Sequence, residues 1–211
     1  MKTIRIPEEE YLTRAKRAAQ MTAERGLDAL FLFGSEGDFQ NVRYFTSVTP
    51  IWERLGVVIT ASGKAAMLTG PEGLTYCQQY CKLDKVFALN ALRSSMDPIP
   101  GKFRMTSFQD VLTELGVTCK HPKIAIGNPI DTTTVIEQTM HEDLPDAVFS
   151  YAPEIMRVLR AAKSENELAC LRESYRIVQL ATDACLEKMQ IIKIITKSCL
   201  LYTSDAADDG E

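Results

Sequence analysis

Short apolar runs alternate with stretches of helical spacing along most of the chain. Residues 27–33 are almost continuously apolar over the length of one strand, which predicts a central strand covered on both faces. Residues 55–60 and 65–69 flank a turn that contains Gly63, and this pattern predicts an antiparallel hairpin. Further strands are predicted at residues 85–89, 123–126 and 147–150. The hairpin makes the expected sheet mixed rather than purely parallel.

The segments between these runs carry the signals of helices. The first helix is expected to begin after Pro7, with three glutamates in its first turn, and to end at Gly26. Its apolar side would include Leu12, and Arg14 would point mostly outward. Further helices are expected at residues 74–81, at 106–116 with Thr106 as the N-cap, at 132–144 and from Pro153 onward. Helices that alternate with strands predict a layered α/β domain.

The last apolar pattern belongs to a long helix at residues 164–190. Ser164 and Glu167 have the spacing of a capping box at its start. Apolar or small residues then recur every three or four positions, as at Leu171, Tyr175 and Val178. Such a face needs a partner to cover it, so we expect this helix to be the first element of a further domain.

Composition and charge exclude several classes of function. The chain has 211 residues, 45% of them hydrophobic, which is enough to build a core. The formal net charge of −4 gives no electrostatic footprint for nucleic acid. The sequence contains no apolar run long enough for a membrane span, and residues 1–11 lack the apolar region of a signal peptide. We therefore expect a cytoplasmic protein with neither nucleic acid nor membrane as a partner.

The sequence does not contain a complete dinucleotide-binding or zinc-binding motif. The glycine-rich turn at residues 34–37 follows a strand, but its spacing differs from the dinucleotide fingerprint. Cys77 and Cys81 lie four residues apart, and a zinc site would need two more ligands, which the isolated His121 and His141 do not supply. Reduced and mostly buried cysteines are the favoured interpretation.

Three segments resemble one family. Residues 160–171 read Arg-x-x-Lys-Ser-x-x-Glu-x-x-x-Leu, residues 26–30 read Gly-Leu-Asp-Ala-Leu, and residues 41–46 read Asn-Val-Arg-Tyr-Phe-Thr. Together they resemble creatinases, prolidases and Xaa-Pro aminopeptidases, the pita-bread metallopeptidases, over residues 5–190. The resemblance implies a creatinase-type N-terminal domain with a mixed, layered α/β fold, followed by the first helix of the catalytic pita-bread domain.

The resemblance also divides the chain. Residues 1–152 would form the N-terminal domain, residues 153–163 a connector, and residues 164–190 the first helix of a truncated catalytic domain. Residues 199–208 read CLLYTSDAAD, which matches the translation of a common transposase-type sequencing adapter. We therefore expect residues 191–211 to be a non-native tail.

The activity implied by the resemblance is that of an Xaa-Pro peptidase of the aminopeptidase P or prolidase type. The family holds two divalent metal ions (Mn, Co or Zn) through ligands downstream of residue 190. No catalytic or metal-binding residue can therefore be assigned here, no cofactor is expected in this fragment, and the fragment is predicted to be inactive. The full-length enzyme would be a homodimer acting on proline-containing peptides. A creatinase-type amidinohydrolase and a non-catalytic α/β interaction module remain the alternatives.

What the N-terminal domain would offer is support for dimerisation and a surface that shapes the substrate pocket. Within residues 43–54, Arg43, Tyr44, Trp52 and Arg54 combine cations with aromatic faces, a set that suits a carboxylate or a short peptide end. The alternative for Tyr44 is core packing, and for Arg43 a structural hydrogen bond. Trp52 and Arg54 follow Pro50 in an expected loop. For these two residues a contact with the substrate and a plain surface position remain equal alternatives.

Overall fold

The structure is a computed structural model that describes residues 4–51, 54–94 and 106–191. It divides into two compact units, which are treated separately. One unit is Pro7–Ala162, and the other joins residues 4–6 to the described residues from Lys163 onward. Trp52, most of the predicted loop at residues 93–102 and almost all of the tail at 191–211 lie outside the described residues.

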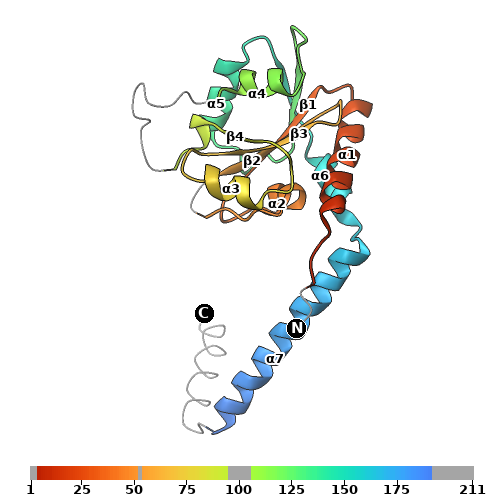
Figure 1. The fold of residues 1–211 in the computed structure, drawn as a ribbon, viewed down its shortest axis with the longest axis vertical. Helices are drawn as coiled ribbons and strands as arrows, with labels where there is room; N and C mark the ends of the chain where they lie inside the picture. Colours follow the sequence, from red (N-terminus) through yellow and green to blue (C-terminus); the bar gives the residue numbers. More distant parts are fainter. Residues whose placement is uncertain (1–3, 52–53, 95–105, 192–211) are drawn as a thin grey trace, which may run out of the picture. The chain divides into compact units, whose positions relative to one another are not determined.

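A six-stranded mixed sheet forms the centre of the unit Pro7–Ala162 (Figure 1). In spatial order the strands are β4 (Val86–Ala88), β3 (Ala65–Thr69), β2 (Leu55–Thr60), β1 (Ala29–Gly34), β5 (Lys123–Ile126) and β6 (Val148–Tyr151). Strand β2 runs antiparallel to both of its neighbours, and every other neighbouring pair is parallel. The predicted hairpin and the mixed sheet are therefore confirmed.

Helices cover both faces of this sheet. Helices α1 (Glu8–Glu24), α2 (Gln40–Thr46), α3 (Leu74–Tyr80) and α6 (Pro153–Ala161) contribute to one core cluster. The second cluster is formed with the short helix η1 (Asn90–Leu92), α4 (Phe108–Glu114) and α5 (Thr134–Asp143). Figure 1 shows α4 and α5 across the sheet from α1 and α6.

Strand β1 explains why both faces must be covered. All six of its residues are buried. Leu30 and Leu32 point into the first cluster, whereas Phe31 and Phe33 point into the second, because side chains alternate along a strand. Phe31 and Phe33 both pack edge-on against Phe108 of α4. The continuous apolar run in the sequence is the signature of this doubly covered strand.

Three local predictions are wrong, namely the placement of Arg14, the placement of Leu12 and the N-cap of α4, and one helix was missed. Arg14 is buried although it was expected to point outward, and Leu12 is exposed although it was expected inside. The N-cap of α4 is Ser107 rather than Thr106, with a capping box completed by Asp110. Helix α2 was not predicted as a helix at all.

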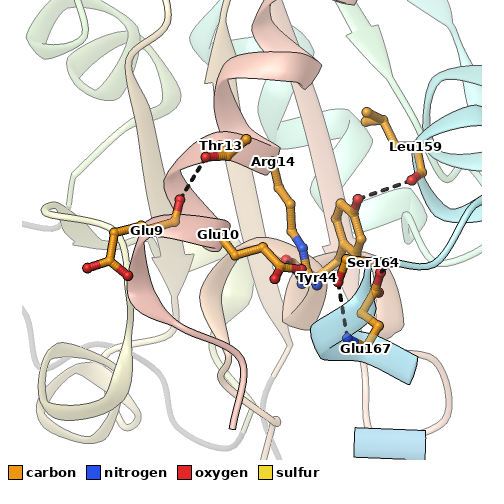
Figure 2. A network of polar contacts seen from close by, with 8 residues as sticks. All are labelled: Glu9, Glu10, Thr13, Arg14, Tyr44, Leu159, Ser164 and Glu167. Atoms are coloured by element: carbon orange, nitrogen blue, oxygen red, sulfur yellow. Dashed lines mark hydrogen bonds and ion pairs between the residues drawn. The ribbon is translucent and has the colours of Figure 1, made fainter. Parts of the chain in front are cut away.

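Helix α7 (Glu165–Ile191) belongs to the second unit. The Glu167 backbone N–H donates to the Ser164 hydroxyl at 3.0 Å, and the Ser164 backbone N–H donates to the Glu167 carboxylate at 2.9 Å (Figure 2). The predicted capping box is thus confirmed. The apolar positions at Leu171, Tyr175 and Val178 are exposed. Among the described residues, none of the helices combines the length and the hydropathy that a membrane span requires.

Candidate functional site

One edge of the sheet collects polar side chains from three parts of the chain. Strands β1 and β5 are parallel, so their carboxyl ends lie at the same edge. Strand β2 is antiparallel to β1 and begins there, because Gly34 pairs with Leu55. We call residues 34–38, Arg54 and residues 127–132 the carboxyl edge. In open α/β sheets, the carboxyl ends of parallel strands are the usual place for ligands.

Asn128 fixes the loop after β5 to the end of β1. Its side chain is buried, and its amide oxygen accepts a hydrogen bond from the Phe33 backbone N–H at 2.8 Å. Its amide N–H₂ donates to the Phe33 carbonyl and, at 3.2 Å, to the Asp131 carboxylate. A side-chain amide thus completes the backbone pairing of Phe33 where the β1–β5 ladder has ended. The sequence analysis assigned no role to Asn128.

Gly34 allows the loop after β1 to fold back tightly. A Cβ atom at this position would lie 2.9 Å from the Asp38 carbonyl oxygen, closer than side chains tolerate. The Ser35 backbone N–H donates to that same carbonyl at 3.1 Å. The turn therefore returns Asp38 to the edge, where its carboxyl group interacts with that of Asp131.

Arg54 is half-buried at this edge. Its Nη1 atom lies 3.5 Å from the Asp131 carbonyl oxygen, which is a long contact. Burial is the main cause that raises the pKa of the Asp131 carboxyl group, and nearby Asp38 raises it further. The hydrogen bond from Asn128 and the positive charge of Arg54 act in the opposite direction. The edge therefore brings two carboxyl groups together, and the guanidinium of Arg54 interacts electrostatically with one of them, that of Asp131.

Tyr44 and Arg43 lie on α2 and differ from each other. Tyr44 is 8% exposed, and its hydroxyl donates to the Leu159 carbonyl of α6 at 3.1 Å. Arg43 is exposed, with its guanidinium 5.9 Å from the centre of the Phe39 ring. Of the four residues predicted for a substrate surface, only Arg54 is described at the carboxyl edge. The fourth, Trp52, is outside the described residues.

Arg14 occupies a buried polar position that the sequence did not reveal (Figure 2). Its guanidinium donates to the Tyr44 carbonyl at 2.9 Å and to the Glu10 carboxylate at 2.6 Å. It also lies 4.3 Å from the centre of the Tyr44 ring and 5.2 Å from that of Tyr11. These contacts join α1 to α2, so the group is structural. The spacing of Glu10 and Arg14, four positions apart, was the available signal.

The cysteines described by the structure are free thiols. Burial raises the pKa of Cys81 to about 11, which disfavours the reactive thiolate. Buried Cys77 donates its thiol to the Thr69 hydroxyl at 3.4 Å. Among the described residues no three His, Cys, Asp or Glu side chains gather into a possible metal site. The resemblance places the ligands of the two divalent ions downstream of residue 190, so it expects none of them among these residues.

Comparison with known proteins gives matches only among solved structures. No protein-family model and no curated protein matches the chain. The prolidase from Pyrococcus horikoshii OT3 aligns with a TM-score of 0.58 and 14% identity, over 83% of this chain and 42% of that chain. The Xaa-Pro dipeptidase from Bacillus anthracis gives 0.57 and 19%, over 84% and 43% respectively.

A third match is to an isolated domain. The N-terminal domain of the cytoplasmic peptidase PepQ from Mycobacterium tuberculosis H37Rv aligns with a TM-score of 0.50 and 18% identity, over 70% of this chain and 98% of that one. The chain thus has the fold of the N-terminal domain of creatinase/prolidase-type peptidases, as the sequence resemblance implied. It spans less than half the length of the prolidase and of the dipeptidase.

Proposed function

We propose that the chain is the N-terminal part of a metal-dependent Xaa-Pro peptidase of the aminopeptidase P or prolidase type. The fold shared with a prolidase over 83% of the chain is the observation that supports this most. The family-like motif at residues 160–171 adds to it, because this motif spans the end of α6 and the start of α7. In this proposal α7 is the first helix of the catalytic domain.

The proposed role of the N-terminal domain is to support a homodimer and to shape the substrate pocket. Arg54 at the carboxyl edge would contact the carboxylate end of a proline-containing peptide, because a guanidinium binds a carboxylate through two parallel hydrogen bonds. Trp52, which is outside the described residues, and exposed Arg43 are the further members of the proposed substrate-binding set. Tyr44 would support this surface from the core, since Arg14 covers its ring.

The two divalent ions of the proposal, Mn, Co or Zn, would supply an activated water and a Lewis acid for hydrolysis. Their ligands would lie in the remaining part of the full-length enzyme, because the described residues hold no suitable cluster. The contribution of this chain would be to bind and orient the peptide. We place the full-length enzyme in the cytoplasm.

The decisive experiment is to read the locus beyond the codon for Gln190 and to express the full-length protein. Purified protein would be assayed with Mn²⁺, Co²⁺ or Zn²⁺ on Xaa-Pro dipeptides, Xaa-Pro tripeptides and creatine. Metal-dependent release of proline or of the N-terminal residue supports the proposal, whereas hydrolysis of creatine alone would assign the amidinohydrolase alternative. The chain of 211 residues, assayed in parallel, is expected to show no turnover above blank.

A substitution in the full-length enzyme tests the proposed contact. Arg54→Ala should lower kcat/KM about tenfold to a hundredfold, because a lost charge-assisted contact is worth roughly 1.5–3 kcal/mol. Trp52→Ala is the companion variant. If that tryptophan only packs, the variant lowers the melting temperature and leaves the kinetics of the folded fraction intact. Native kcat/KM and a native melt in Arg54→Ala would remove Arg54 from the site.

A further inference from the structure

The turn that carries Asp131 is held rigidly at the carboxyl edge. The Asn128 side chain fastens the start of the turn to Phe33 of β1. Within the turn, the Asp131 backbone N–H donates to the Asn128 carbonyl at 3.2 Å, and the Thr132 hydroxyl donates to the same carbonyl at 3.1 Å. The position of Asp131 is therefore set by the sheet and not by a loosely attached loop.

Asp131 acts on Arg54 through two different groups. Its backbone carbonyl oxygen lies 3.5 Å from Nη1 of the Arg54 guanidinium, a long contact that still brings the end of that side chain to the turn. Its carboxyl group interacts electrostatically with Arg54 and also with the carboxyl group of Asp38. The charged groups that face Asp131 are thus Asp38, from the loop after β1, and Arg54, directly before β2.

This arrangement opposes the binding of an anion by Arg54. When both carboxyl groups are ionised, they carry two negative charges against the one positive charge of Arg54. An incoming carboxylate must then displace or tolerate these charges, because like charges repel at close range. Protonation of the Asp131 carboxyl group removes one of these negative charges.

We propose that Asp131 is a positioning residue that sets the anion affinity of Arg54. Its turn carbonyl aims the guanidinium, and its carboxyl group, together with that of Asp38, competes with the carboxylate of a ligand. The inference deepens the proposed function and rests on it, because it assumes that Arg54 meets the carboxylate end of a peptide.

The competition predicts a pH dependence of binding. Burial raises the pKa of Asp131, so this carboxyl group takes up its proton at a higher pH than an exposed aspartate does. Anion affinity should therefore rise as the pH falls from 7 towards 5, a range in which a simple carboxylate ligand stays ionised. Asp131→Asn keeps the size of the side chain and carries no charge, so its affinity should stay constant over that range.

The test uses the chain of 211 residues with N-acetyl-L-proline as the probe, and binding is measured by NMR titration. At pH 7, Asp131→Asn should bind about two- to fivefold more tightly than the unsubstituted chain, which is the size expected for one partly exposed charge. Asp38→Asn should shift the affinity in the same direction. Arg54→Ala should remove binding at this edge, and the double variant Arg54→Ala/Asp131→Asn should match Arg54→Ala.

Thermal melts show whether the variants fold. The direction in which the melting temperature changes is a second prediction. A carboxyl group whose pKa is raised by folding lowers stability when it is ionised. Asp131→Asn should therefore melt higher than the unsubstituted chain at pH 7. This advantage should shrink as the pH falls through the raised pKa of Asp131, and it should vanish below about pH 3.9, the ordinary value for aspartate.

Three results would overturn the inference. They are equal affinity of Asp131→Asn and the unsubstituted chain at pH 7, unchanged binding in Arg54→Ala, and the same pH profile with and without the Asp131 carboxyl group. Failure of the proposed function is distinguishable, because it would appear as the absence of Xaa-Pro hydrolysis by the full-length protein. The binding experiment on this chain does not depend on that hydrolysis.

Discussion

Helices α6 and α7 follow each other in the chain and differ in where their apolar residues lie. In α6, Ile155, Met156 and Leu159 are buried in the core cluster on one face of the sheet. In α7, Leu171, Tyr175 and Leu180 are exposed. Both helices have a recognisable start, with Pro153 in the first turn of α6 and the Ser164–Glu167 capping box at α7.

The difference between α6 and α7 shows what an amphipathic sequence pattern predicts and what it leaves undetermined. Apolar spacing indicates that a helical face gains free energy when it leaves water. It does not indicate which surface will cover that face. Helix α6 has its covering surface within Pro7–Ala162, whereas Leu171, Tyr175 and Leu180 of α7 are exposed.

Matched leucines give the largest expected contrast between the two helices. Leu159 is 1% exposed and Leu180 is 55% exposed. Leu159→Ala should lower the free energy of unfolding by about 2–5 kcal/mol, because it leaves a cavity in a close-packed core. Leu180→Ala should change it by less than about 0.5 kcal/mol. Urea unfolding of both variants measures the contrast. Equal destabilisation would mean that α7 has a covering surface in this chain.

Matched tyrosines should give a smaller contrast. The Tyr44 hydroxyl donates to the Leu159 carbonyl, one of the last-turn carbonyls of α6 that lack a helical partner. Tyr44→Phe should cost about 1–2 kcal/mol, since a buried acceptor loses its donor. Tyr175 of α7 is 73% exposed, so Tyr175→Phe should leave stability unchanged within error. Thermal melts at one pH compare the two, and a neutral Tyr44→Phe would contradict the importance of this contact.

Removal of residues 163–211 should have the smallest effect. If Pro7–Ala162 folds alone, the shortened chain should unfold with a free energy within about 0.5 kcal/mol of the full chain, while solubility rises. A chain that ends at Ala152 is the control, because it also loses the buried residues of α6 and should fail to unfold cooperatively. If removal of residues 163–211 abolished the cooperative transition, the proposed division of the chain after Ala162 would be wrong.

The elements that the sequence predicted well are those whose signals are local. The hairpin of β2 and β3 matches its predicted bounds, because apolar runs and a glycine turn define both strands. Strand β5 matches as well, and the central strand β1 follows from its continuous apolar run. Helix α2 was missed because seven residues form too short a helix to be stable by propensity alone, so its stability comes from packing.

The candidate site was predictable only in part, because its contacts join distant positions. Arg54 was singled out, but its contact with the Asp131 carbonyl spans 77 positions. Asn128 meets Phe33 across 95 positions, and Arg14 meets Tyr44 across 30. Local propensity carries no signal for such pairs. The carboxyl edge therefore emerges only once the order of the strands is known.

The amide of Asn128 has a consequence for the chemical ageing of the protein. The hydrogen bond that the Asn128 side chain donates to the Phe33 carbonyl requires an amide, because an aspartate would place a negative oxygen against that carbonyl. Spontaneous deamidation of asparagine begins when the backbone nitrogen of the next residue, after losing its hydrogen, attacks the side-chain amide. The next residue here is Pro129, whose backbone nitrogen carries no hydrogen to lose. The sequence thus protects, at the level of covalent chemistry, the side chain that fastens the turn after β5 to β1.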